Sequence, residues 1–143
     1  MPVGPTPSVE RTPTASGPGR LLVTVYGLFA LAATSRAAVQ LATRFDEAPV
    51  AYLLSAFSAV VYVIAAVALA LGGSLARRLA WIAVTTELVG VLVIGTFSVL
   101  VPQHFPRATV WSAYGIGYLF IPLVLPLLGL WWLRRTGVHP EPP

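Results

Sequence analysis

The chain contains no cysteine and no lysine, and it carries little charge of either sign. Without cysteine, disulfide bonds, thiolate metal sites and cysteine nucleophiles are all excluded. Charged residues make up 10% of the 143 residues, whereas a soluble domain usually carries about 25%. The chain therefore lacks the polar surface that would cover a folded domain of this length in water.

Long apolar sequence takes the place of charge, since 57% of the residues are hydrophobic. A membrane-spanning helix needs about 20 apolar residues to cross roughly 30 Å of hydrocarbon. Apolar stretches of at least this length cover about residues 21–43, 50–71, 79–101 and 109–133. Because the loops between them are short, the sequence predicts an all-α membrane protein, an antiparallel four-helix transmembrane bundle over residues 20–135.

The two ends of the chain differ from these stretches in composition. Residues 1–19 are rich in Pro, Gly, Ser and Thr and have little to bury, so we predict a disordered tail there. Residues 136–143 form a similar, shorter tail. Arg20 followed by the apolar run 21–33 would also suit a cleaved secretory signal, but the apolar pattern continues through Ala42 and favours a retained helix.

Proline and glycine mark the predicted helix boundaries. Pro49 suits the first turn of the second helix, and Gly72-Gly73 suits its end. Pro102 cannot continue the third helix. Pro122 and Pro126 fall inside the fourth stretch, where we expect them to kink a membrane helix without ending it.

Because the chain has no lysine, its positive side-chain charges come from arginine, and the distribution of the arginines predicts the orientation of the chain. The side of the bundle with both termini carries Arg11, Arg20, Arg77, Arg78, Arg134 and Arg135. The other side carries only Arg44 and Arg107. The positive-inside rule therefore predicts that both termini are cytoplasmic. Abundant Ala, Gly, Pro, Val and Arg with no Lys is typical of a GC-rich bacterium, so we expect a bacterial plasma membrane. Trp81 and Trp131-Trp132 then fall near the inner interface and Trp111 near the outer one, where indole rings are enriched.

Glu87 is the most informative polar residue within the apolar stretches. It lies about 12 Å from the cytoplasmic end of the third stretch, and a charge at membrane depth costs on the order of 2.5–3.5 kcal/mol. One interpretation is a carboxyl group that couples the movement of protons or cations. The other is a neutral, hydrogen-bonded glutamic acid that joins helices. We favour the second interpretation, because no relay of further acids accompanies Glu87.

Arg36 is the second charged residue within a stretch, and Gln40 lies on the same helix face one turn later. Arg36 is about 24 Å along the first helix, so its depth differs from that of Glu87 by about 12 Å. An ion pair between them would need a tilted helix. The simpler expectation is that Arg36 extends to the outer surface, toward Asp46 or Glu47.

Three tyrosines in the apolar stretches complete the candidate intramembrane polar site. Tyr62 shares a face with small residues of the second helix, and Tyr114 and Tyr118 are one helical turn apart. Helix packing is the expected role of such positions. The alternative is a pocket lined by Tyr62, Tyr114, Tyr118 and Glu87 and opened by the proline kinks. A further hypothesis is an enzyme accessory that holds a lipid or quinone between the three tyrosines.

Motifs for catalysis are missing from the sequence. His104 and His139 lie on opposite sides of the predicted membrane, so they cannot share a metal or haem. Phosphate-binding glycine loops, Ser/His/Asp sets and metal-ligand spacings do not occur. We therefore expect no enzymatic activity, no cofactor and no metal. The arginines lie at helix ends and form no patch, so nucleic acid is not an expected partner.

The function we predict is that of a non-enzymatic structural or accessory membrane subunit. Its expected partners are the lipid bilayer and either a second copy of the chain or a larger membrane protein. The alternative is a small oligomeric transporter or channel that uses Glu87.

In length, helix number, arginine-only basic charge and Pro-rich tail, the chain resembles small four-helix integral membrane proteins of unassigned role from actinobacteria. The resemblance covers the whole chain and implies a multi-pass bacterial membrane protein. Small multidrug exporters are also similar, because they have four helices and one membrane carboxyl group. Their glutamate lies in the first helix, whereas Glu87 lies in the third, so their function is not transferred.

Overall fold

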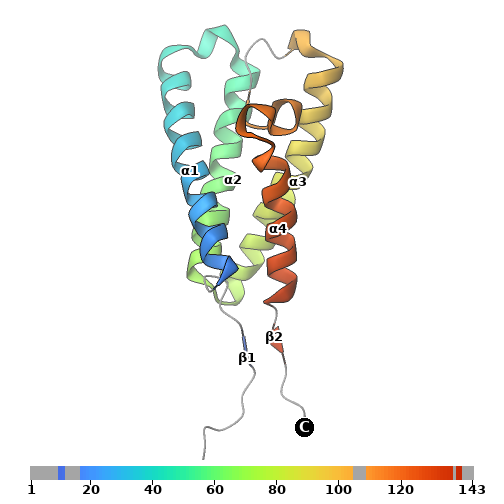
Figure 1. The fold of residues 1–143 in the computed structure, drawn as a ribbon. Helices are drawn as coiled ribbons and strands as arrows, with labels where there is room; N and C mark the ends of the chain where they lie inside the picture. The colour runs from blue at the N-terminus through green and yellow to red at the C-terminus, as the bar shows by residue number, and fades with distance from the viewer. Residues whose placement is uncertain (1–9, 12–16, 105–108, 137, 140–143) are drawn as a thin grey trace, which may run out of the picture.

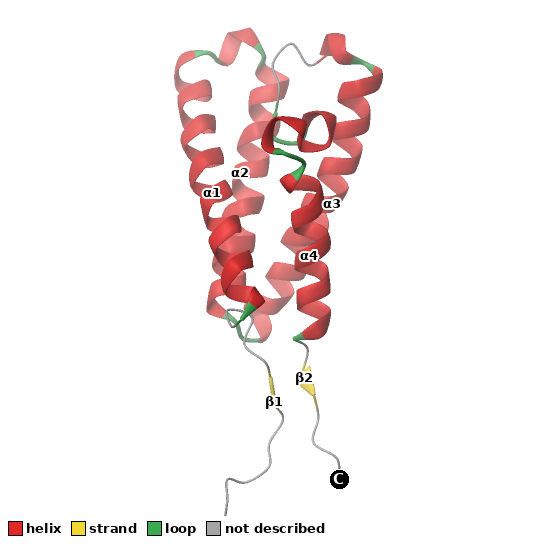
Figure 2. Cartoon of the chain, in the orientation of Figure 1, coloured by secondary structure: helices red, strands yellow, loops and turns green. Residues whose placement is uncertain are grey.

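The computed structural model describes residues 10–11, 17–104, 109–136 and 138–139. Four α-helices lie side by side in it (Figure 1): α1 (Pro18–Thr43), α2 (Pro49–Leu71), α3 (Ser74–Leu100) and α4 (Ile121–Arg135). Short 3-10 segments lie between them, namely η1 (Phe45–Glu47), η2 (Pro102–His104) and η3 (Ser112–Tyr118). Helix makes up nearly all of the described chain (Figure 2), so the predicted all-α class is confirmed.

The helices α1, α2 and α3 are each long and apolar enough to cross a membrane. Their bounds agree closely with the predicted stretches, except that α3 begins earlier, at Ser74. The turn before it uses two left-handed glycines, Gly72 (φ 71°) and Gly73 (φ 89°). Glycine adopts this backbone without a steric penalty, so a tight turn joins α2 directly to α3.

The fourth stretch differs from the single helix predicted over residues 109–133. The two segments η3 and α4 meet at 99° and together make at most one broken span. The break lies at Leu119 (φ 58°) and Phe120 (φ 59°), which are left-handed and cannot continue a right-handed helix. The predicted kink at Pro122 is therefore wrong: Pro122 lies in the first turn of α4, and only Pro126 is inside that helix.

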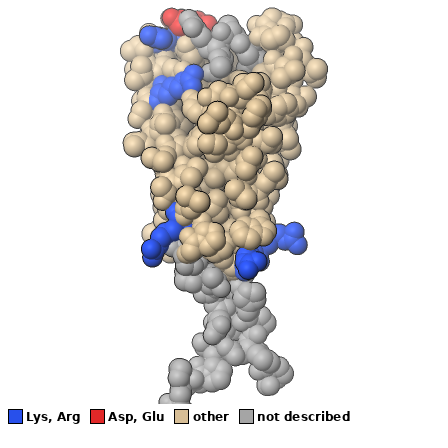
Figure 3. Space-filling view, viewed as in Figure 1, with Lys and Arg blue, Asp and Glu red and all other residues tan. Residues whose placement is uncertain are grey.

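The interior of the bundle is filled by one apolar cluster to which every helix contributes. Its fully buried members include Tyr26, Tyr62, Leu69, Val84 and Leu133. The opposite faces of the long helices leave large apolar side chains exposed, as at Leu28 and Leu31. On the face shown in Figure 3, charged side chains gather toward the two ends, with a broad uncharged band between them. This is the surface expected of a protein surrounded by hydrocarbon.

Both ends of the described chain leave the bundle at the same end (Figure 1). There β1 (Glu10–Arg11) pairs antiparallel with β2 (Val138–His139), and the α2–α3 turn lies at this end as well. The segments η1 and η2 lie at the opposite end. Most of the tails predicted to be disordered, residues 1–19 and 136–143, falls outside the described residues, and so does Arg107.

Candidate functional site

The residues from Thr109 to Phe120, here called the broken segment, replace part of the expected fourth helix. Their backbone is left-handed at Ala113 (φ 48°), Tyr114 (φ 61°) and Gly115 (φ 85°). Each non-glycine residue in this conformation costs about 1–2 kcal/mol, so surrounding contacts must hold it. In a membrane, irregular backbone is tolerated only where protein buries it or where it lines a water-filled cavity.

Two glycines of α3 make room for the broken segment. A Cβ atom at Gly90 would lie 2.5 Å from the Trp111 ring, and one at Gly95 would lie 2.5 Å from the Tyr114 ring. Both distances are far inside van der Waals contact, so only glycine allows this approach. Ser98 adds a polar contact, because its Oγ accepts a 2.8 Å hydrogen bond from the Ala113 N–H.

Trp111, which the sequence places near the outer interface, belongs to the buried core of the bundle. Its side chain is 1% exposed. The indole Nε1–H donates a 3.1 Å hydrogen bond to the hydroxyl oxygen of Tyr62 on α2. The broken segment is therefore tied to α3 through the glycines and to α2 through this bond.

Glu87 lies in the centre of the bundle and is 0% exposed. The Tyr26 hydroxyl group donates a 2.6 Å hydrogen bond to Glu87 Oε1. Tyr62 lies close enough for its hydroxyl group to interact with the carboxyl group, yet among the described residues Oε2 has no partner in hydrogen-bonding geometry. The backbones of α1 and α3 do not approach each other closely, so the Tyr26–Glu87 bond joins two helices across the interior.

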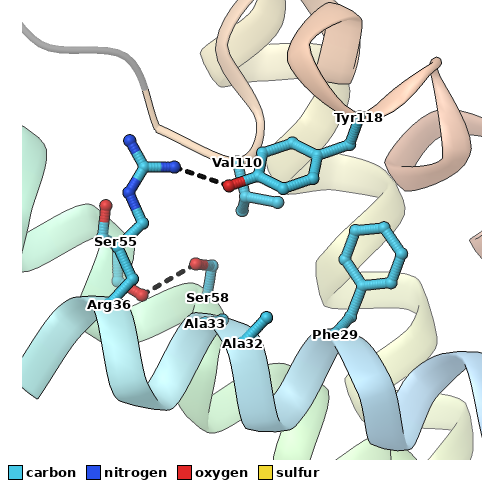
Figure 4. A pocket seen from close by; sticks show the side chains of 8 residues that line it. All are labelled: Phe29, Ala32, Ala33, Arg36, Ser55, Ser58, Val110 and Tyr118. Atoms are coloured by element: carbon cyan, nitrogen blue, oxygen red, sulfur yellow. Dashed lines mark hydrogen bonds between the residues drawn. The ribbon is translucent and has the colours of Figure 1, made fainter.

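Arg36 pairs with the broken segment and makes no ion pair with Glu87. Its Nη1–H donates a 2.6 Å hydrogen bond to the Tyr118 hydroxyl oxygen (Figure 4). Arg36 and Tyr118 together form part of the walls of two neighbouring cavities.

The smaller cavity lies between α1, α2 and the broken segment, and Figure 4 shows the side chains around it. The volume open to the centre of a water-sized sphere is about 20 Å³, and one water needs about 10–15 Å³. Its remaining lining residues are Phe29, Ala32, Ala33, Ser55, Ser58 and Val110.

The larger cavity, here called the vestibule, has a volume of about 540 Å³ on the same measure. That volume falls in the range of about 300–1,000 Å³ typical of small-molecule sites. Its lining residues are Arg36, Ser98, Thr109, Ser112, Ala113, Ile116, Gly117 and Tyr118, so most of its wall comes from the broken segment. A third, apolar groove of about 350 Å³ runs between α1 and α2, and it offers a ligand no charged side chain.

The predicted site residues thus divide into separate groups. Tyr62 lies beside Glu87, and Arg36 lies beside Tyr118. Tyr114 points elsewhere, because its hydroxyl group lies 2.7 Å from Thr96 Oγ1. Left-handed backbone at Tyr114 and Gly115 rotates the rings of Tyr114 and Tyr118 apart, so the two rings do not share the helix face that regular spacing predicts.

Gln40 has a buried Oε1 without a hydrogen-bond partner among the described residues, and nothing in the structure explains it. Tyr26 and Trp111 were not among the predicted site residues, although Tyr26 donates the hydrogen bond to Glu87 and Trp111 donates the one to the Tyr62 hydroxyl. For Tyr26 a signal existed, since Leu22, Tyr26 and Ala30 lie on one buried face of α1. For Trp111 there was none.

The part of the chain that the structure describes contains no group of three or more His, Asp or Glu residues able to hold a metal ion. Comparisons with protein-family models, with curated proteins and with solved structures find no match to this chain.

Proposed function

We propose that this chain is a multi-pass protein of a bacterial plasma membrane, built as an antiparallel four-helix transmembrane bundle with both termini in the cytoplasm. The three complete candidate spans and the broken fourth span support this topology. The exit of both chain ends from one end of the bundle supports it as well. That end carries Arg20, Arg77, Arg78, Arg134 and Arg135, in agreement with the positive-inside rule.

Reporter fusions at the two chain ends test this topology. A reporter that is active only in the cytoplasm should be active at both ends, and a reporter that is active only outside should be silent at both. Activity of the outside reporter at either end would contradict the proposed threading.

Within the membrane we propose a non-enzymatic structural or accessory role. The observation that carries this proposal is the environment of Glu87. Its carboxyl group is completely buried and accepts a hydrogen bond from Tyr26 of α1. A hydrogen bond between helices in hydrocarbon stabilises their packing. Neither of the cavities lined by Arg36 has Glu87 among its lining residues. Glu87 in this position joins α1 to α3 and lines neither of these two cavities.

Purification in a mild detergent tests the accessory role. We expect the protein to elute as an oligomer or with a stable membrane-protein partner, and Glu87→Gln, which keeps an acceptor oxygen for Tyr26, should leave this association unchanged. A monodisperse monomer with no co-purifying protein would contradict the proposal.

A second candidate function is a small oligomeric transporter or channel that uses Glu87. The observation that favours it is the unsatisfied Oε2 of Glu87 in a bundle that also carries a polar vestibule. Proton-coupled flux into liposomes that disappears in Glu87→Gln would support this function. Flux that survives the substitution would eliminate a role for the glutamate.

A further inference from the structure

The vestibule lies close to the end of α1 that carries η1. Arg36 is seven residues before the last residue of α1, Thr43, so its Cα lies about 10 Å from that helix end. In the proposed topology this depth is near the boundary between hydrocarbon and headgroups on the outer side. A polar cavity at that depth is accessible to solutes and to lipid headgroups.

The charge of the vestibule wall has one sign. Arg36 is its single charged lining residue among the described residues, and no carboxylate lines it there. A guanidinium group presents five N–H donors in a planar fork, which matches the oxygens of phosphate groups. An ionisable group that faces a cavity within a membrane protein is also a general marker of a binding site or pathway.

The hydroxyl groups of the wall have hydrogens left to donate. Tyr118 accepts its hydrogen bond from Arg36, so its own O–H is not used in that bond. Thr109 and Ser112 share one hydroxyl–hydroxyl hydrogen bond of 3.1 Å. Each of these two oxygens also accepts from a backbone N–H, Thr109 Oγ1 from Trp111 and Ser112 Oγ from Thr109. One of the two hydroxyl hydrogens therefore remains for another acceptor.

The wall thus combines a positive charge with surplus O–H donors from two places on the broken segment. A ligand that satisfies them must be rich in acceptor oxygens and negatively charged. A phosphate group fits, because it accepts hydrogen bonds at several oxygens arranged in three dimensions. The cavity volume of about 540 Å³ leaves room for an organic group attached to the phosphate.

We propose that the vestibule binds a phosphate group, which belongs either to a small soluble molecule or to the headgroup of an anionic lipid. Arg36 supplies the charge, Tyr118 orients the guanidinium group and donates its own hydroxyl, and the Thr109–Ser112 pair supplies a further donor. This site is distinct from Glu87 and does not depend on whether the protein is an accessory subunit or a transporter.

The experiment uses the full chain, purified and delipidated in a neutral detergent, with binding followed by calorimetry. The probes are inorganic phosphate and short-chain dihexanoyl phosphatidylglycerol, with dihexanoylglycerol, which has the same acyl chains and no phosphate, as the control. If inorganic phosphate binds, a soluble anion is sufficient as the ligand; if only phosphatidylglycerol binds, the ligand is a lipid headgroup. Dihexanoylglycerol should bind at least about tenfold more weakly than the better anionic probe.

Arg36→Gln should weaken binding of that probe by about tenfold or more, because a charge-assisted hydrogen bond is lost. Arg44→Gln is the matched control, since Arg44 is exposed beyond the end of α1 and is absent from the vestibule lining, and it should bind like the wild type. Tyr118→Phe is a second, milder variant and should weaken binding by about fivefold.

Thermal unfolding without ligand checks that each variant is folded, and Tyr118→Phe decides the test if Arg36→Gln is not folded. Three results would overturn the proposal: no binding of either anionic probe, equal binding of dihexanoylglycerol, or wild-type affinity in folded Arg36→Gln and Tyr118→Phe.

Discussion

The hydroxyl group of Tyr26 on α1 donates a 2.6 Å hydrogen bond to Glu87 Oε1 on α3, across the centre of the bundle. Both side chains are 0% exposed. The missing side chain at Gly129 of α4 leaves room for this contact, because a Cβ atom there would lie 3.1 Å from the Tyr26 hydroxyl oxygen. Residues of three helices therefore meet at one buried polar contact.

Tyr26→Phe should destabilise the protein, because it removes the donor to Glu87 Oε1, and Oε2 already has no hydrogen-bond partner among the described residues. We expect the free energy of unfolding in detergent to fall by about 1–2 kcal/mol. Tyr52→Phe is the matched control: its hydroxyl group bonds Glu47, an exposed residue, at 3.2 Å. If Tyr26→Phe lowered the free energy of unfolding no more than Tyr52→Phe does, the proposed role of the Tyr26–Glu87 contact would be contradicted.

The Tyr26–Glu87 contact should also appear as coupling in a double-mutant cycle. Glu87→Leu removes the acceptor, and Tyr26→Phe removes the donor, so each single variant leaves the other partner unsatisfied. In the double variant neither polar group remains, and its destabilisation should be smaller than the sum of the two by about 1 kcal/mol. Strict additivity of the three unfolding free energies would show that the two groups do not interact.

Gly90→Ala and Gly95→Ala should each displace the broken segment, because the added Cβ atom would lie 2.5 Å from the ring of Trp111 or Tyr114. Overpacking of this kind destabilises by about 1–3 kcal/mol. Displacing Trp111 from its buried position should shift its fluorescence to longer wavelength.

Gly27→Ala is the control for both variants, since a Cβ atom there meets nothing within 4 Å. Within a helix this change should be neutral or stabilise by up to about 1 kcal/mol. If Gly90→Ala and Gly95→Ala behaved like Gly27→Ala, the close packing of the broken segment on α3 would be disproved.

The bounds of α1 and α2 and the end of α3 could be predicted, because hydropathy and turn residues mark them. The break in the fourth span could not, because Tyr114, Leu119 and Phe120 carry no local signal for left-handed backbone. Their conformation depends on α3, where glycines distant in sequence receive the rings of the broken segment. A local pattern of tyrosines therefore predicted a regular helix face that does not form.

In the candidate site, too, the sequence predicts what depends on local composition and misses what depends on packing between helices. Glu87 was found from the sequence because a carboxyl group in an apolar stretch is unusual. Its partner Tyr26 was missed, because partners across a bundle depend on how each helix is rotated about its axis. The pairing of Arg36 with Tyr118 was missed for the same reason, and it depends further on the irregular backbone before Tyr118.

Labelling of single cysteines with a membrane-impermeant maleimide in intact cells tests the central claim, a membrane bundle whose broken fourth span opens to the outer side. The natural chain has no cysteine, so each introduced thiol reports alone. The account predicts labelling of Asp46→Cys in η1 and of Ile116→Cys, which lines the vestibule and is 61% exposed. Ser74→Cys, at the start of α3 and at the end proposed to be cytoplasmic, and Leu128→Cys, on the apolar outer face of α4, should stay unlabelled. Labelling of Ser74→Cys from outside, or protection of Ile116→Cys equal to that of Leu128→Cys, would contradict it.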